Sequence, residues 1–138
     1  MIGSRTGLRF AALAFAATAV VGLGGVAVAS PTPQNGVLED AEMGLYYNSN
    51  QGGCVHDYTA DDKTFSNNRF KGSPSCSGYD NVVNDDTASY RNRSLLQWCV
   101  FTDADWQGAA GQIPSGHIGN ASVNFKNKIS SSSWGACW

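Results

Sequence analysis

The chain has 138 residues, of which 42% are hydrophobic, with 9 basic and 11 acidic side chains. This is enough for one globular domain with a modest core. Lys and Arg form no cluster along the sequence, which argues against nucleic acid and anionic membrane surfaces as partners.

The first 29 residues have the pattern of a secretory signal peptide. Arg5 and Arg9 form a short basic region, a run of small apolar residues follows, and Ala27 and Ala29 occupy the positions that a signal peptidase reads. The run is just long enough to span a bilayer, so a retained membrane anchor is the alternative. Cleavage after Ala29 predicts a secreted, extracellular mature chain of residues 30–138 with no membrane contact.

All four cysteines lie in the mature part of the chain, at Cys54, Cys76, Cys99 and Cys137. An even number in an exported protein indicates two disulfides, for which three pairings are possible. A zinc site is the alternative, but no two cysteines stand two to four residues apart, as structural zinc sites usually require. Without the two arginines of the signal peptide, 7 basic and 11 acidic side chains remain, a net charge of −4.

Residues 30–42 contain two prolines and no periodic apolar pattern, so we expect a flexible leader there and a domain that begins near Met43. Beyond this point Gly, Asn, Ser and Asp recur every few residues, and these residues favour turns over helices. Short runs suited to β-strands lie between them, at 44–47, 94–101, 111–118 and 121–125. Many short strands separated by turns predict an all-β sandwich or barrel.

The run at 121–125 shows the clearest alternation, because Val123 and Phe125 are apolar and the residues beside them are polar. This is the period of a half-buried strand. The stretch "DADWQG" at 103–108 could form one turn of helix, which Gly108 and Gly111 would end.

Two short patterns occur twice in the chain. "YYNSNQGG" at 46–53 matches "FTDADWQG" at 101–108 with an offset of 55, and "NDDTAS" at 84–89 matches "KNKISS" at 126–131 with an offset of 42. The chain therefore consists of two related units, about 43–93 and 94–138, and the first carries about 13 extra residues, which we expect within 61–80. The glycine that closes the first pattern suits a fold-back at positive φ, covered by the aromatic residue.

These residues resemble the two Greek-key motifs of the βγ-crystallins, which implies an all-β sandwich made of two Greek-key repeats. That family's motif begins with Tyr or Phe, has a second aromatic five positions later and Gly two positions after that. The second copy matches fully and the first copy has Gln51 in place of the second aromatic. The family's later signature, two Asn or Asp, two variable residues, Ser or Thr and then Ser, is broken at Ala88 in the first copy and at Lys126 in the second.

Within that fold, the chain is similar to the peptidase inhibitors typified by the Streptomyces metalloproteinase inhibitor, which carry phrases such as "LY.....GG" and "NDxxSS" in the same order. This resemblance covers about 43–134 and implies a secreted, monomeric inhibitor whose partner is a peptidase, with a metallopeptidase as the favoured class. Many relatives have a Cys before the first "LY", where this chain has Gly44. The alternative is a calcium-binding structural or cell-surface module that has no peptidase target.

The crystallin-like fold also implies the disulfide pairing, because the first and last strands of one motif are neighbours in a sheet. Cys99 enters the first strand of the second repeat and Cys137 follows its last strand, so we expect Cys99–Cys137 and, in the first repeat, Cys54–Cys76.

An inhibitor of this kind offers a loop that is already held in a substrate-like shape, so that little entropy is lost on binding. A disulfide at the base and an apolar residue beside it meet this need at Cys54-Val55 and at Cys99-Val100. The first pair follows a turn and the second lies in an apolar run. We therefore predict that the inhibitory loop consists of Gly52, Gly53, Cys54, Val55 and His56.

No cofactor is required, although calcium-binding relatives pair Asn or Asp oxygens of one signature with the Ser or Thr hydroxyl of the other. Asn84 and Asp85 can pair with Ser130 in this way. The reciprocal site would pair Asn127 with Ala88, which has no side-chain oxygen, and Lys126 adds a repelling charge. We predict at most one weak calcium site; the alternative is that these residues only cap turns.

The sequence contains no nucleophile elbow, zinc-peptidase motif or phosphate-binding loop, and its only glutamates, Glu39 and Glu42, fall in the expected leader. His56 and His117 are more typical of packing or surface histidines than of catalysts. We predict that the protein is not an enzyme. A surface that stacks sugars is a further possibility, because four tryptophans are available, at Trp98, Trp106, Trp134 and Trp138.

Overall fold

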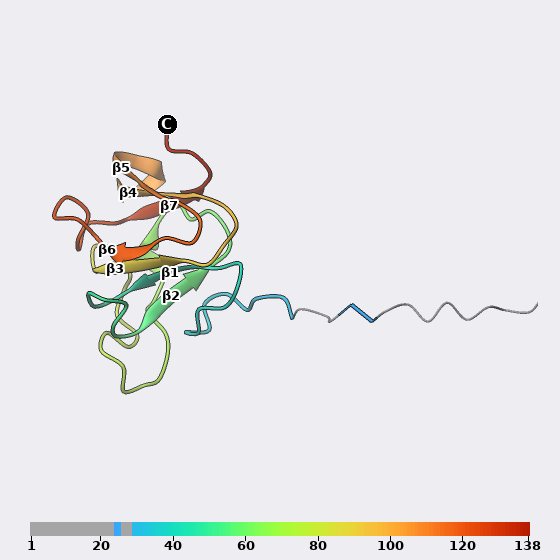
Figure 1. Cartoon of the computed structure of the whole chain (residues 1–138). Helices are drawn as coiled ribbons and strands as arrows, with labels where there is room; N and C mark the ends of the chain where they lie inside the picture. The colour runs from blue at the N-terminus through green and yellow to red at the C-terminus, as the bar shows by residue number, and fades with distance from the viewer. Residues whose placement is uncertain (1–23, 26–28) are drawn as a thin grey trace, which may run out of the picture.

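The computed structural model describes residues 24–25 and 29–138, in which two antiparallel sheets pack face to face (Figure 1). The predicted signal peptide lies almost wholly outside these residues, and within them no helix could cross a membrane. The strands are β1 (Met43–Tyr46), β2 (Val55–Tyr58), β3 (Ser89–Asn92), β4 (Trp98–Asp103), β5 (Gln107–Ile113), β6 (Ile118–Asn120) and β7 (Ser131–Trp134). Two short 3₁₀ turns accompany them, η1 (Phe65–Asn67) and η2 (Ala104–Trp106).

Each sheet takes a segment from the other repeat. The first sheet has the order β2-β1-β3-β6, so that β6 of the second repeat lies beside β3 of the first. The second sheet has the order β5-β4-β7, and a bridge between Asp62 and Ser132 places a segment of the first repeat beside β7. This exchange is the Greek-key sandwich that the sequence predicts, and the all-β fold class is confirmed.

The two repeats have the same strand register. Leu45 of β1 lies opposite His56 of β2, and Val100 of β4 lies opposite Gly111 of β5. Val100 follows Leu45 by 55 residues, and Gly111 follows His56 by the same number. On its other side Leu45 lies opposite Tyr90, and Val100 lies opposite Ser132, which is 42 residues beyond Tyr90. The two offsets found in the sequence are therefore the offsets of the structure.

The duplicated turn also has one backbone conformation. Gly53 and Gly108 have φ values of 74° and 79°, and the second aromatic position has φ values of 55° at Gln51 and 59° at Trp106. Glycine carries no steric penalty in this left-handed region. At Gly108 a side chain would also collide with its surroundings, because a Cβ there would lie 2.3 Å from Thr102 Oγ1.

Hydrogen bonds explain how Gln51 replaces an aromatic residue in the first repeat. Trp106 Nε1 donates to the carbonyl of Ser132 at 3.1 Å. Gln51 Nε2 donates to the carbonyl of Tyr90, the equivalent residue, at 3.3 Å. The amide thus keeps the hydrogen bond of the indole but supplies no ring.

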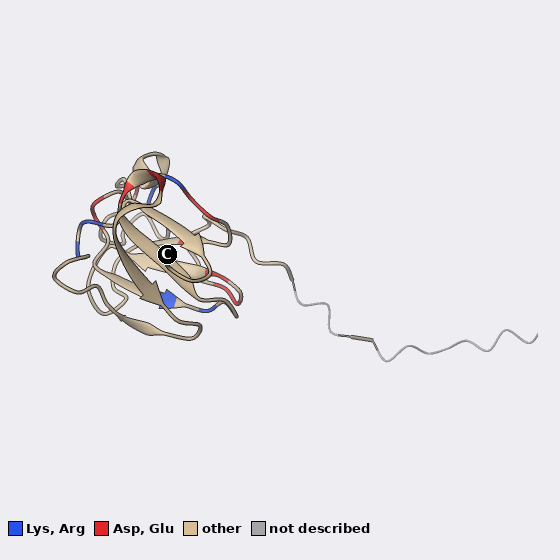
Figure 2. Ribbon diagram, turned by 90° about the horizontal axis from the view of Figure 1, so that it is seen from above, with Lys and Arg blue, Asp and Glu red and all other residues tan. Residues whose placement is uncertain are grey.

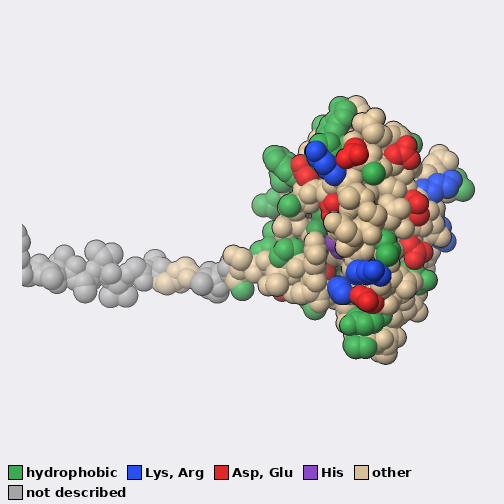
Figure 3. Space-filling model, turned by 180° about the vertical axis from the view of Figure 1, so that it is seen from behind, with side chains coloured by type: hydrophobic (Ala, Val, Ile, Leu, Met, Phe, Trp, Pro, Cys, Tyr) green, Lys and Arg blue, Asp and Glu red, His purple; other side chains and the backbone are tan. Residues whose placement is uncertain are grey.

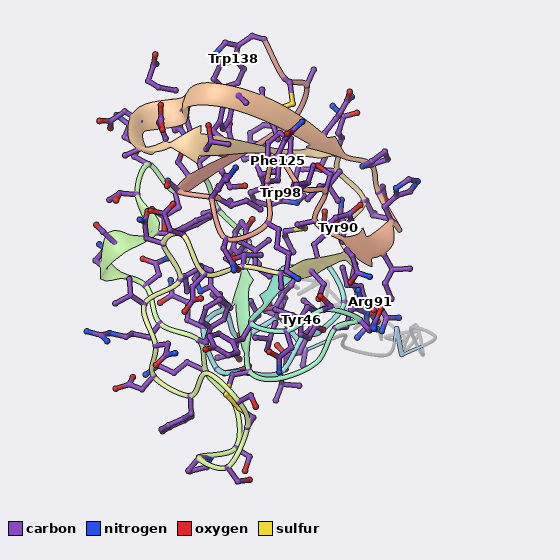
Figure 4. All side chains as sticks on the ribbon, turned by 90° about the vertical axis from the view of Figure 1, so that its left-hand side faces the viewer. Tyr46, Tyr90, Arg91, Trp98, Phe125 and Trp138 are labelled. Carbon is purple, nitrogen blue, oxygen red and sulfur yellow. A yellow bond between two sulfur atoms is a disulfide. The ribbon has the colours of Figure 1, made fainter. Side chains whose placement is uncertain are left out.

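The core lies between the sheets and centres on Trp98, which is labelled in Figure 4. Tyr58 meets this indole edge to face at 4.9 Å between ring centroids, and Trp98 Nε1 donates to Ser94 Oγ at 3.0 Å. Other buried members of the cluster come from both sheets, from the long connection between β2 and β3, and from the segments just before β2 and β7; they are Met43, Leu45, Cys54, Phe65, Phe70, Val83, Val100, Ile113 and Ile129.

The cysteines form the two expected disulfides, Cys54–Cys76 and Cys99–Cys137, with Cα atoms 5.2 Å and 5.3 Å apart. Figure 4 shows them at opposite ends of the molecule, one beside Trp138 and the other at the base of a projecting loop. Each repeat is therefore closed by its own covalent bond.

The expectation of a flexible leader is wrong for the part that adjoins the domain. Gln34 N donates to the carbonyl of Asp57 at 2.8 Å, and the backbone nitrogens of Asn35 and Gly36 donate to its carboxylate at 3.1 Å and 2.9 Å. Glu42 is fully buried. The lack of apolar periodicity indicated correctly that this segment is irregular, but a buried carboxylate can hold an irregular segment as firmly as a strand pairing can.

The predicted strand at 121–125 is also wrong, because the chain forms turns there and Val123 is 82% exposed. Phe125 packs over Gly111, where a Cβ would lie only 2.8 Å from the Phe125 ring. Phe125 is the aromatic residue that anchors this turn. Its position two residues after Val123 gives the sequence the polar–apolar alternation of a strand, although the backbone is not extended. The run at 94–101 is a strand only from Trp98, and the run at 111–118 is divided by a turn between β5 and β6.

Candidate functional site

The two later signatures run beside each other and exchange backbone hydrogen bonds. Asp85 N donates to the carbonyl of Ile129 at 3.1 Å, and Asn127 N donates to the carbonyl of Thr87 at 2.9 Å. Each bond is the equivalent of the other at the offset of 42. Both donors are left-handed, with φ values of 60° and 57°. The crossing forms two open hollows, one for each repeat.

The first hollow contains the predicted calcium ligands. Ser130 Oγ donates to Asp85 Oδ1 at 3.1 Å, and Asn84 lines the same hollow. Asp103 and Lys128 also line it. The structure therefore brings together the three residues that the sequence selected, from two signatures more than forty residues apart.

The chemistry of this hollow suits a weakly held calcium ion. Calcium takes six to eight oxygen ligands and prefers several carboxylates. Asp85 and Asp103 supply the carboxylates of the hollow, while the Lys128 ammonium opposes a second positive charge. Within residues 24–25 and 29–138, no three His, Cys, Asp or Glu side chains gather closely enough to hold a metal ion by themselves. Backbone carbonyls and water would have to complete the shell.

The second hollow has only part of the equivalent ligand set. It is lined by Asp86, Asn127 and Ala88, and Ala88 occupies the place that Ser130 has in the first hollow. Lys126 lies in it, with its Nζ 3.4 Å from Ser49 Oγ. A buried methyl group and an ammonium group do not fit a calcium ion. Burial raises the pKa of Asp86.

The predicted inhibitory loop, Gly52 to His56, has to be corrected. Cys54, Val55 and His56 are 1%, 5% and 1% exposed, and the last two belong to β2. A turn precedes them, as the sequence indicates, but Val55 and Lys71 then exchange two backbone hydrogen bonds at 2.8 and 3.0 Å. This pairing covers the outer edge of β2. A segment enclosed by neighbours on both sides cannot enter the cleft of another protein.

His56 is a packing residue. Its Nε2 lies 3.0 Å from Asn68 Nδ2, which also donates to Asp62 Oδ2 at 2.6 Å. The ring stacks on Tyr58 and meets Phe65 edge to face. Burial lowers the pKa of His56 from its ordinary value to about 4. The imidazole is therefore neutral at pH 7 and accepts the amide hydrogen.

The four tryptophans do not form one surface, because Trp98 is only 1% exposed. Trp138 is 73% exposed and lies tilted against Phe101, with ring centroids 5.4 Å apart. It also meets Trp106 edge to face at 6.2 Å. Trp134 is 53% exposed at the end of β7. Trp106 thus packs within its motif, as the repeated pattern predicts.

Charged groups are dispersed on this surface. Figure 2 shows Lys, Arg, Asp and Glu spread along the ribbon, and the face drawn in Figure 3 has both signs interspersed among uncharged atoms. The two ion pairs found in the described part of the chain are Lys71 with Asp80 at 2.8 Å and Arg93 with Asp40. The visible surface therefore has no single-sign patch of the kind that attracts polyanions.

Sequence reasoning missed the connection between the repeats, residues 93–97. Leu95 is 92% exposed and Leu96 is 50% exposed, whereas Asn92 and Ser94 beside them are buried. The sequence predicts one strand over 94–101, which includes these leucines. The alternation of polar and apolar residues breaks at the paired leucines, and this break was the available signal.

The fold is similar to those of several solved structures. Neither a family model nor a curated protein sequence matches the chain. A structure described under "Evolution of the eye lens beta-gamma-crystallin domain fold" is 21% identical, with a TM-score of 0.56 over 75% of this chain and 95% of the other. A βγ-crystallin domain from Flavobacterium johnsoniae is 22% identical, with a TM-score of 0.52 over 68% and 93%. The N-terminal domain of protein S is 13% identical, with a TM-score of 0.51 over 68% and 94%. The likeness establishes the βγ-crystallin-like fold.

Proposed function

We propose that this βγ-crystallin-like protein is secreted as a monomer and inhibits an extracellular peptidase, with a metallopeptidase as the expected target. It acts by binding, without catalysis and without a required cofactor. The phrases that resemble the peptidase inhibitors support this class. The observation that carries the proposal is that two exposed loops are anchored to the sandwich, 72–80 by a disulfide and 93–97 by buried hydrogen bonds.

The loop 72–80 projects from the end of the first repeat (Figure 1). The disulfide of Cys76 anchors it to the buried Cys54, and the Lys71–Asp80 ion pair spans its base. Tyr79 is 42% exposed on it. These residues lie in the segment where the first repeat is longer than the second, so the sandwich does not need them in order to close.

Rigid loops of this kind suit inhibition. A loop that is ordered before it binds loses little conformational entropy in the complex, so more of the contact energy appears as affinity. The scaffold supplies that order through the two disulfides and the packed interior. The substrate-like segment must therefore be sought in the exposed loops and not in β2.

A panel of secreted metallo-, serine and cysteine peptidases, assayed with the purified mature chain, tests this function. We expect micromolar or tighter inhibition of at least one metallopeptidase, and its loss after reduction of the disulfides. Albumin at the same concentration is the control for an added protein that merely competes with the assay substrate for the peptidase. Failure to inhibit any member of the panel would contradict the proposal.

The second candidate is a calcium-binding structural or cell-surface module without a peptidase target. The Ser130–Asp85 contact at 3.1 Å, in a hollow that also contains Asp103, favours it. Calorimetric titration with calcium should show at most one weak site, and Asp85→Ala should remove it. Two comparable sites in the native chain would contradict this assignment.

A further inference from the structure

The connection between the two repeats displays two adjacent leucines on a loop that the interior holds in place. Leu95 exposes 92% of its surface and Leu96 exposes 50%. A single exposed leucine is ordinary on protein surfaces and carries no information. The informative feature is the set of buried polar groups beneath this pair.

Asn92 supports the loop from inside the protein, where it is only 1% exposed. Its Nδ2 donates to the carbonyl of Leu96 at 2.8 Å and to that of Ile113 at 3.1 Å. Its Oδ1 accepts from Ser94 N at 2.9 Å and from Ser94 Oγ at 2.7 Å. One buried amide therefore joins both sides of the loop tip to β5.

Ser94 adds a second buried support. Its Oγ accepts from Trp98 Nε1 at 3.0 Å and from Leu96 N at 3.3 Å, while its one hydroxyl hydrogen goes to Asn92 Oδ1. Ser115 Oγ donates to the carbonyl of Ser94 at 2.6 Å. The central tryptophan of the core is thus hydrogen-bonded to the loop, and the position of Leu95 is coupled to the core.

Both ends of the loop are paired with neighbouring segments. Arg93 N donates to the carbonyl of Glu42 at 2.8 Å, and its own carbonyl accepts from Ala41 N at 3.1 Å. The carbonyl of Gln97 accepts from Gly135 N at 2.6 Å, and Gln97 Nε2 donates back to the Gly135 carbonyl at 3.1 Å. These bonds fix the entry and exit of the loop and leave its tip projecting.

We infer that the loop 93–97 enters the active-site cleft of the target peptidase and that Leu95 fills an apolar specificity pocket there. This inference rests on the proposed function and identifies the segment that performs it. An apolar anchor in a pocket is the usual centre of binding energy in an interface. The loop tip is uncharged, and Arg93 at its base is neutralised by Asp40.

The other braced loop is less suited to this role. Cys76 N donates to the carbonyl of Ser73 at 2.9 Å, and Tyr79 N donates to the carbonyl of Cys76 at 3.1 Å. These bonds fold the loop 72–80 into consecutive turns. The loop 93–97 also bends, at 94–96, but its tip displays Leu95 at 92% exposure, whereas Tyr79 on the loop 72–80 is 42% exposed, so Leu95 is the better apolar anchor.

The test compares the inhibition constants of matched surface variants of the mature chain against the peptidase that the wild type inhibits. Leu95→Asp should raise the inhibition constant about 100-fold and Leu95→Ala about tenfold, because the leucine that would be buried in the complex is replaced by a charge or by a methyl group. Val123→Asp is the control, since Val123 is 82% exposed in a different turn. It should leave the constant unchanged. Thermal unfolding shows that each variant is folded.

Hydrogen exchange on the wild-type complex provides a readout that needs no variant. Amides of residues 93–97 should gain protection on binding, and those of 121–125 should not. A wild type that inhibits while Leu95→Asp inhibits equally well, or a complex without protection at 93–97, overturns this inference and leaves the inhibitory function standing. A wild type that inhibits no peptidase overturns both. A wild-type dimer that Leu95→Asp converts to a monomer assigns the leucines to self-association and also overturns it.

Discussion

The two repeats share a backbone and differ in what they place on it. Strand register, left-handed turn positions and the paired bonds between the signatures are the same at offsets of 55 and 42. The side chains at equivalent places differ: Gln51 stands for Trp106 and Ala88 for Ser130. The shared features are those that the fold requires, and the unequal ones are free to acquire a function.

The difference extends to the interior of each hairpin. His56 in β2 is equivalent to Gly111 in β5, because they lie opposite the equivalent residues Leu45 and Val100. The first repeat fills this position with an imidazole held by Asn68, whereas the second leaves room for the ring of Phe125. At this position the first repeat therefore contains a buried titratable side chain, His56, and the second contains a glycine covered by the Phe125 ring.

Removal of the disulfides should have the largest effect on the comparison. The two bridges close segments of 22 and 38 residues, so constraint of the unfolded chain contributes about 3.4 kcal/mol for Cys54–Cys76 and about 3.9 kcal/mol for Cys99–Cys137. Each pair is replaced by alanines, and the free energy of unfolding is measured with urea. The second replacement should cost slightly more.

The packing around the two bridges sharpens this test. Cys54 and Cys99 are both almost fully buried, so loss of side-chain contacts is similar in the two variants. A cost several-fold larger for the first repeat would show that the loop 72–80 stabilises the sandwich and is not an addition to it.

The next largest effect concerns pH and only the first repeat. His56 has a pKa lowered to about 4 in the folded protein, below its ordinary value of 6.5, because burial disfavours the charged ring. Burial of the neutral imidazole therefore has no proton-linked cost above about pH 6.5. As the pH falls from 6.5 toward 4 the free energy of unfolding decreases, because the unfolded chain binds the proton more readily than the folded protein does. Between pH 7.5 and 5 the free energy of unfolding should fall by about 2 kcal/mol.

The His56→Gln variant should lack this pH dependence, whatever its stability at pH 7.5. His117→Gln is the matched control, since His117 is exposed, and it should behave as the wild type. The carboxyls of Glu42 and Asp57, whose pKa values burial raises, oppose the trend, because the folded state takes up their protons more readily than the unfolded chain as the pH falls; the difference between the wild type and His56→Gln isolates the histidine. A wild type with flat stability from pH 7.5 to 5 would refute the assignment of a buried neutral His56.

The fold could be predicted from the sequence because the repeated turn requires particular residues. Glycine at positive φ in Gly53 and Gly108, and the offsets between the copies, fixed the number of repeats and their order. The crossed signatures placed Asp85 beside Ser130 for the same reason. These features depend on local backbone geometry, which a short pattern records.

The loops could not be predicted, because their exposure depends on segments distant in the sequence. Val55 is buried by Lys71, which follows it by sixteen residues, and the leader is held by Asp57 across a gap of more than twenty. Leu95 is displayed because Asn92 is anchored to β5. No periodicity within a single run contains this information.

Exchange of the second aromatic position should have a smaller effect than loss of a disulfide. Trp106→Ala removes an indole packed against Trp138 and a hydrogen bond, and should cost about 2 kcal/mol. Gln51→Ala removes only hydrogen bonds, to Tyr90 and to Gly119, and should cost about 1 kcal/mol.

Trp106→Gln separates the contribution of indole packing from that of the hydrogen bond, since it gives the second repeat the residue that the first repeat has at this position. Its cost should lie between those of the two alanine variants, as measured by urea denaturation. Equal costs for Trp106→Gln and Trp106→Ala would show that the glutamine amide of the first repeat does not replace the indole hydrogen bond.

The smallest effect is expected at the signatures, where two of the side chains that differ between the repeats can be exchanged. Ala88→Ser combined with Lys126→Asn gives the second hollow the hydroxyl and the amide oxygen that the first hollow has in Ser130 and Asn84. Calcium titration of this double variant should show a second, weaker site, because a hydroxyl and an amide oxygen then stand beside Asp86 and Asn127 and the repelling Lys126 ammonium is gone. Ala88→Ser alone should not add a site while Lys126 remains. If the double variant binds no more calcium than the native chain, the two exchanged side chains do not account for the difference between the hollows, and the remaining differences, such as Asn127 in place of Asp85, do.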